Sequence, residues 1–160
     1  DLPKNIQGNQ LAIAETIENN LRKVIIEESP TNPMYFAKMS ILLDELIKLR
    51  KEATLEYEKY LQKFIELTRK VKKPHTTTAY PSSLNTPAKR SLYDNLGNNE
   101  ALANDLDQKI VSTKKDSWRD HKIKLKEVRL VIEGVLKKYG ITEENEVHRI
   151  FDLVKNQRDY

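Results

Sequence analysis

The 160-residue sequence contains no cysteine, four glycines and three histidines. The absence of cysteine excludes disulfide bonds and thiol catalysis. Four isolated glycines cannot form a glycine-rich phosphate loop, whose backbone must approach the ligand closely. No apolar run approaches the roughly 18 residues that cross a bilayer, so we expect a cytoplasmic chain without a membrane partner.

The composition favours an all-α protein, because 32% of the residues are charged and glycine is scarce. A chain of this length normally forms one domain with a core of its own. We predict a linker over residues 1–8 and a single helical domain over residues 9–160. Because the chain begins at Asp1, we expect it to be a piece of a longer protein.

The central prediction is one long helix over about residues 33–72. Pro33 suits a first helical position, and no glycine or proline occurs between Met34 and Lys73. Apolar side chains recur there every three or four residues, as in an amphipathic helix: Met39, Leu43, Leu46, Ala53, Tyr57, Tyr60, Phe64, Leu67 and Val71. The other segments would pack against this helix.

Five shorter helices complete a predicted bundle of about six. The first covers residues 9–28, and a long loop rich in proline, threonine and serine occupies residues 73–87. Thr86 and Gly97 are expected to bound the next helix, and Asn98 or Asn99 to cap the one after it. The last two helices are predicted from about Lys122 to Tyr139, ending at Gly140, and from Thr142 onward.

No residue pattern indicates an active site. His75, His121 and His148 lack the i, i+4 spacing of a helical metal site. Asp107 and Lys109 have a spacing found in metal-dependent nucleases, but they fall on the polar face of a predicted helix. We therefore predict no catalytic residue, no metal and no cofactor in this chain.

Two basic segments are the candidates for binding DNA. If the chain is helical from Asp116 onward, four cations share one face and Lys115 extends the row, which could follow a phosphate backbone. A second group brackets the long loop. The candidates are Arg69, Lys70, Lys72, Lys73, Lys89, Arg90, Lys115, Arg119, Lys122, Lys126 and Arg129. The alternative is that these side chains only solvate helix surfaces. Trp118, beside Arg119, could stack on a base, but we interpret it as a core anchor.

Four stretches in register resemble the C-terminal region of the motor (restriction) subunit of type I restriction-modification enzymes. They extend over the chain from about Leu11 to the end and read NPMYFAKMSILLDELI, YPSSLNTPAKRSLYDNL, KKDSWRDHKIKLKEVRLVI and VKNQRDY. The resemblance implies that a PD-(D/E)xK endonuclease domain and ATPase lobes, which use Mg and ATP, lie upstream in the parent subunit. It also implies methyltransferase and specificity subunits, the rest of the motor subunit and duplex DNA as partners.

Three functions remain open from the sequence. The first is a noncatalytic assembly domain that also contacts DNA, and the second is a protein-docking module without DNA contact. The third is an independent nuclease that uses Asp107.

Overall fold

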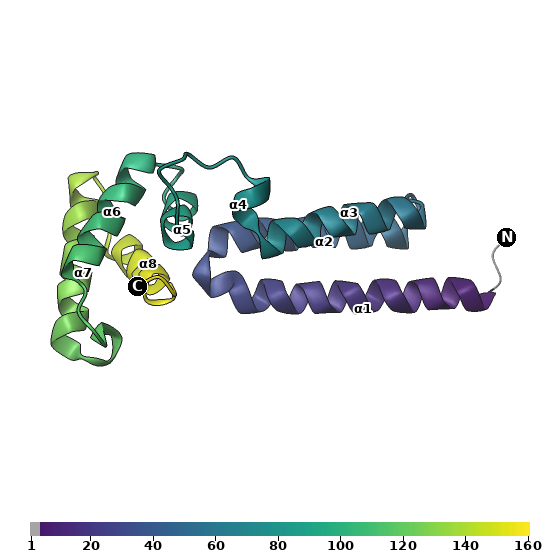
Figure 1. The fold of residues 1–160 in the computed structure, drawn as a ribbon, viewed down its shortest axis with the longest axis horizontal. Coiled ribbons are helices and arrows are strands. Elements are labelled where there is room, and N and C mark those ends of the chain that lie inside the picture. The colour runs from purple at the N-terminus through teal and green to yellow at the C-terminus, as the bar shows by residue number, and fades with distance from the viewer. Residues whose placement is uncertain (1–3) are drawn as a thin grey trace. The chain divides into compact units, whose positions relative to one another are not determined.

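The computed structural model describes the backbone of residues 4–160 and the side chains of residues 8–160. Within this range the fold is all-α, as predicted, and contains no strand (Figure 1). Ser29–Thr31 and Trp118–Asp120 form 3-10 turns. The α-helices are α1 (Lys4–Glu28), α2 (Pro33–Lys51), α3 (Tyr57–Lys72), α4 (Pro74–Thr77), α5 (Pro87–Asn95), α6 (Glu100–Thr113), α7 (Lys122–Lys138) and α8 (Glu144–Lys155).

The described chain packs as two compact units, where the sequence predicted a single domain. Residues 4–29 and 35–79 form the first unit, and residues 30–34 and 80–160 form the second. Residues 4–8 of the predicted linker belong to α1, and residues 1–3 lie outside the described residues. No helix in the described range is long and apolar enough to cross a membrane.

The first unit consists of α1, α2 and α3, which run side by side, with the short α4 at the end of α3 (Figure 1). Each long helix contributes one apolar face to a shared core, as the recurrence of apolar residues at helical spacing predicted. Leu43 and Tyr60 are the most completely buried of these side chains on α2 and α3, at 0% and 1% exposure.

The predicted single helix over residues 33–72 is wrong, because the helix ends at Lys51 and restarts at Tyr57. Ala53 adopts the left-handed conformation (φ 54°). Its N–H donates to the Arg50 carbonyl at 3.1 Å, and the Thr54 N–H donates to the Leu49 carbonyl at 3.2 Å. These two bonds form a Schellman motif, which satisfies the terminal carbonyls and turns the chain out of the helix. This break and α4, inside the predicted loop, raise the described α-helices from about six to eight.

The second unit is built from α5 to α8 (Figure 1). The buried faces of these helices enclose Trp118. Trp118 is 2% exposed, and its indole N–H donates to the carbonyl of Tyr160 at 3.0 Å. The interpretation of Trp118 as a core anchor is therefore confirmed, and the carboxyl-terminal residue is held in the same core.

Buried amides fix the segment Pro30–Met34 within the second unit. The Asn95 side chain donates to the Asn32 side-chain oxygen at 2.8 Å and accepts from the Met34 N–H at 3.3 Å. Gln157 donates to the Thr31 carbonyl at 2.7 Å. Buried polar groups must find such partners, so these bonds set the path of a segment that buries little apolar surface.

The caps predicted from sequence are mostly confirmed. Thr86 accepts from the Lys89 N–H and Asn99 from the Leu102 N–H, while Gly97 and Gly140 follow their helices with positive φ. The exception is Thr142, because α8 begins two residues later with Glu143 at its N-cap.

Candidate nucleic-acid interface

Among the described residues, the carboxyl end of α3 carries the most concentrated group of cations whose side chains form no ion pair or hydrogen bond. Arg69, Lys70 and Lys72 lie in its last turn and Lys73 follows as the C-cap residue. Val71, between them, is buried and anchors this turn in the core of the first unit. Positive charge is favourable here because the helix dipole places partial negative charge at a C-terminus.

These four side chains form no ion pair or hydrogen bond with any residue that the structure describes. Three of them are exposed and Lys70 is half-buried. Their turn is held by the backbone carbonyl of Lys70, which accepts a 2.6 Å hydrogen bond from the Tyr35 hydroxyl. We call Arg69, Lys70, Lys72 and Lys73 the α3 basic cluster.

Lys89 and Arg90 hold the loop that precedes α5. The Lys89 ammonium group contacts the Asn85 side-chain oxygen at 3.1 Å and lies 4.0 Å from the Asp107 carboxylate. The Arg90 guanidinium donates to the Leu84 carbonyl at 3.0 Å. Part of the long predicted loop is thus fixed by the two cations that were candidates for DNA binding.

Arg119 does not share a helix face with the other candidates. Helix α7 begins only at Lys122, so the condition for the predicted row, a helix from Asp116, is not met. The Arg119 guanidinium donates to the carbonyls of Lys155 and Gln157 at 2.9 and 2.6 Å, and it stacks 4.5 Å from the Trp118 ring centre. Burial lowers the pKa of Arg119 from its usual value. Arg119 therefore satisfies carbonyls at the end of α8.

Two more candidates are engaged in ion pairs. Arg129 pairs with Glu144 and lies 3.9 Å from Glu133, and Lys115 lies 3.3 Å from Glu127. Lys122 and Lys126 are exposed and have no such partner among the described residues. Six of the eleven candidates thus remain uncommitted: the α3 basic cluster, Lys122 and Lys126.

Of the two residues with nuclease-like spacing, Asp107 and Lys109, Asp107 is hydrogen-bonded within the fold. The Asp107 carboxylate accepts from the hydroxyl of Tyr160, while Lys109 is exposed on α6. Burial is the main cause that raises the pKa of Tyr160, followed by this hydrogen bond. The residues that the structure describes include no cluster of three metal-ligating side chains.

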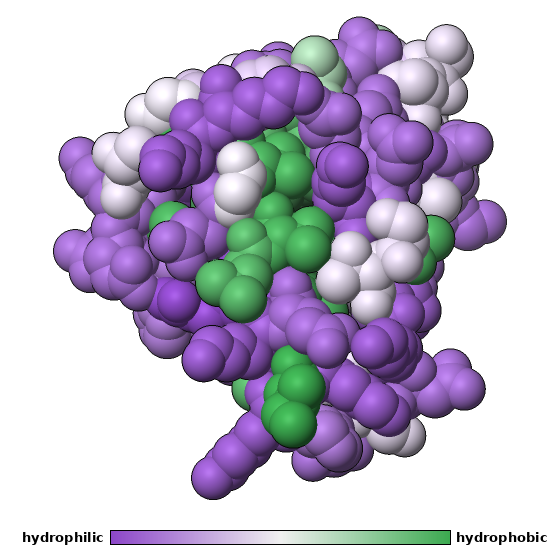
Figure 2. Space-filling view, turned by 90° about the vertical axis from the view of Figure 1, so that its left-hand side faces the viewer, coloured by the Kyte–Doolittle hydropathy of each residue, from purple (hydrophilic) through white to green (hydrophobic). Residues whose placement is uncertain are grey.

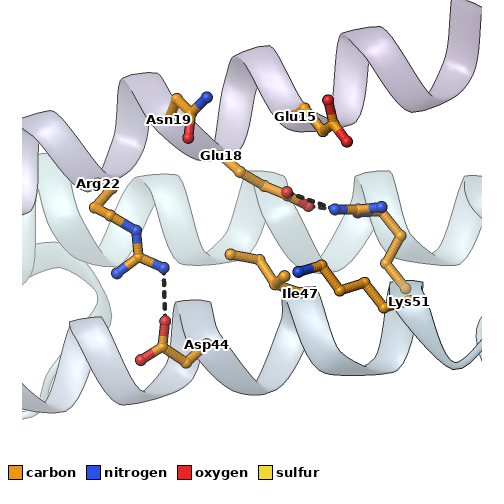
Figure 3. Close-up of a pocket in the computed structure, with 8 residues that line it drawn as sticks. Glu15, Glu18, Asn19, Arg22, Asp44, Ile47 and Lys51 are labelled. Carbon is orange, nitrogen blue, oxygen red and sulfur yellow. Dashed lines mark hydrogen bonds and ion pairs between the residues drawn. The ribbon is translucent and has the colours of Figure 1, made fainter.

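A polar groove of about 370 Å³ between α1 and α2 was not foreseen from the sequence (Figure 3). Glu18, which is 4% exposed, accepts two hydrogen bonds from Arg50 at 2.6 and 2.8 Å and a third from the Tyr60 hydroxyl at 2.7 Å. Arg22 and Asp44 form a second pair 2.6 Å apart at the same groove.

Glu18, Arg50 and Tyr60 are bound to one another in this groove. The hydrogen bond to Glu18 is the main cause that raises the pKa of Arg50, and burial is the main cause that raises the pKa of Tyr60. Both groups are therefore held in their ordinary protonation states. A carboxylate that already accepts three hydrogen bonds has little capacity left to act as a base.

The geometry thus offers surfaces for binding and few groups for catalysis. The α3 basic cluster is the most concentrated basic site on the described residues, and a phosphate backbone is a ligand that suits it. Comparison of the chain with protein-family models, with curated proteins and with solved structures finds no match.

Proposed function

We propose that this chain is a noncatalytic assembly domain of the motor subunit of a type I restriction-modification enzyme. In this role it holds the motor to the methyltransferase and specificity subunits and contributes basic contacts to duplex DNA during ATP-dependent translocation. ATP, Mg and the nuclease chemistry belong to the upstream part of the parent subunit, and the complex acts in the cytoplasm.

One observation carries the DNA part of the proposal. The α3 basic cluster places four cations within five residues, and no described residue forms an ion pair with them. Each phosphate contact by such a cation releases condensed counterions, so affinity falls as salt rises. The resemblance in sequence, which involves segments of both units, supports the assembly part.

Duplex DNA affinity as a function of salt tests the DNA part. We expect log Kd to change with log salt by about 0.9 for each phosphate contact. Replacing Arg69, Lys70, Lys72 and Lys73 together by glutamine should reduce this slope by about 3 to 4. The measurement is fluorescence anisotropy of a labelled duplex titrated with the full chain.

A matched variant separates a local site from net charge. Replacing Lys23, Lys38, Lys48 and Lys59 by glutamine removes the same charge from exposed positions elsewhere in the first unit. The proposal predicts that this variant keeps most of the wild-type slope. Equal losses in the two variants would contradict a specific cluster. No DNA binding in low salt would favour the docking module without DNA contact.

A further inference from the structure

The outward face of α7 presents large apolar side chains that no described residue covers. Ile123 is 67% exposed and Leu130 is 56% exposed. They lie seven residues apart, so two helical turns bring them to the same side. The core-facing side chains of this helix, Val128, Ile132, Val135 and Leu136, lie on the opposite side. Figure 2 shows hydrophobic side chains on the otherwise hydrophilic surface of the second unit.

Gly134 continues the same face one turn beyond Leu130. No heavy atom lies within 4 Å of the position that a Cβ would occupy there. No other part of the described chain therefore packs closely against this glycine. A glycine in a helix interior costs about 1 kcal/mol relative to alanine. On an open face, a missing side chain lets the axis of a second helix approach closely.

The charges that border this face are unbalanced. Lys122, Lys126 and Lys137 line one flank, are exposed, and have no ion-pair partner among the described residues. The same helix carries only two acidic residues: Glu127 pairs with Lys115, and Glu133 lies 3.9 Å from Arg129, which also pairs with Glu144. The occupant that complements this flank is therefore acidic.

We propose that the outward face of α7 binds an acidic amphipathic helix of a partner protein. Its apolar side chains would pack on Ile123 and Leu130 and its backbone near Gly134, while carboxylates would meet the three lysines. This inference rests on the proposed docking role and names its surface and the chemistry of its partner. A phosphate backbone fits the face less well, because two large aliphatic side chains stand at its centre. A second copy of α7 fits less well too, because its lysines would lie against the same lysines and the like charges would repel.

The test uses a labelled helical peptide of about 21 residues, with leucines at heptad a and d positions and glutamates on the flanks. A second peptide has lysines in place of the glutamates. Titrated with the full chain, the acidic peptide should bind at least about tenfold more tightly than the basic one. Leu130→Glu should weaken that binding about tenfold or more. Gly134→Leu should weaken peptide binding about fivefold or more, because the leucine side chain would fill the space that the backbone of the bound peptide occupies.

Ile41→Glu on α2 is the matched control, because Ile41 is 58% exposed and Leu130 is 56% exposed. This control should leave the peptide affinity unchanged, and circular dichroism confirms that each variant is folded. The inference is overturned if the acidic peptide does not bind, or if Ile41→Glu weakens binding as much as Leu130→Glu. It is also overturned if Leu130→Glu dissolves a dimer of this chain, or if duplex DNA displaces the peptide from the same lysines.

The peptide assay needs neither the methyltransferase nor DNA, so its outcome is independent of the test of the proposed function. If the peptide fails while the chain still assembles with the methyltransferase core, the docking face lies elsewhere. If the peptide binds while assembly fails, α7 binds a helix from another complex.

Discussion

Glu18 links the three long helices of the first unit. This residue is 4% exposed, and its carboxylate joins α1 to α2 through Arg50 and to α3 through Tyr60 at the edge of the polar groove. Removing one partner of a buried ion pair leaves the other charge without compensation, which costs more than the pair itself contributes. The three hydrogen bonds therefore matter more for the register of the helices than for net stability.

We expect Glu18→Gln to lower the free energy of unfolding by about 3 kcal/mol, because it leaves the Arg50 guanidinium uncompensated. Urea denaturation followed by circular dichroism measures the change. The double variant Glu18→Leu with Arg50→Met is the control, and it should recover most of the loss because no buried charge remains. A double variant as unstable as Glu18→Gln would contradict this account.

Tyr60 and Tyr160 should make the chain sensitive to alkali. Burial and a neighbouring carboxylate raise the pKa of both hydroxyls above the usual value of 10.0. As the pH rises past about 10, the unfolded state releases these protons first, so the free energy of unfolding falls. The fall is at most about 1.4 kcal/mol per pH unit for each group.

Urea unfolding at about pH 9 and about pH 11 measures this dependence. Tyr60→Phe and Tyr160→Phe should each make it shallower, because phenylalanine has no proton to release. If the wild-type chain and both variants lose the same stability over this range, the two hydroxyls do not carry the effect.

At the scale of elements, the turn after α2 decides the architecture of the first unit. An unbroken helix over residues 33–72 could not fold back to pack two of its own segments with α1. The Schellman motif at Ala53 makes the reversal possible without glycine, although an L-residue in the left-handed conformation costs about 1–2 kcal/mol.

Ala53→Gly tests the turn through the sign of its effect. In the observed conformation, glycine relieves the strain and should raise the free energy of unfolding by about 0.5–1 kcal/mol. In a continuous helix, the same change would lower it by about 1 kcal/mol. Urea denaturation gives the sign, and native-state hydrogen exchange in α2 and α3 locates the effect. If Ala53→Gly lowers the free energy of unfolding, the result would contradict the turn and favour a single long helix.

The sequence predicted elements whose signals are local. Thr86, Asn99, Gly97 and Gly140 mark helix ends by chemistry that acts within a few residues. The break at Ala53 escaped prediction because apolar residues keep their helical spacing across it and alanine carries no stop signal. The helix end is made by backbone N–H groups and by the Thr54 hydroxyl, which donates to the Leu49 carbonyl at 3.1 Å, and no glycine or proline marks it.

The candidate site was only partly predictable for a related reason. Whether a cation is available to a ligand depends on acceptors far away in sequence, such as the Lys155 carbonyl that Arg119 reaches 36 residues later. The network of Glu18 with Arg50 and Tyr60 joins positions 32 and 42 residues apart. No sequence pattern predicted these pairings.

At the scale of the whole molecule, the described residues differ in whether their charged groups are already engaged within the fold. The ionic groups of the polar groove neutralise one another, and Asp107 holds the terminal tyrosine. What remains available is charge at the end of α3 and an apolar strip with lysines on α7. Both features suit a chain that holds larger partners together.

Sedimentation velocity tests this central claim most directly. The full chain is mixed with the methyltransferase and specificity subunits of the restriction system from the same organism, at low salt and without ATP. The account predicts that the folded chain sediments with that complex in a fixed stoichiometry. A folded chain that sediments alone, while the other subunits remain assembled, would contradict it.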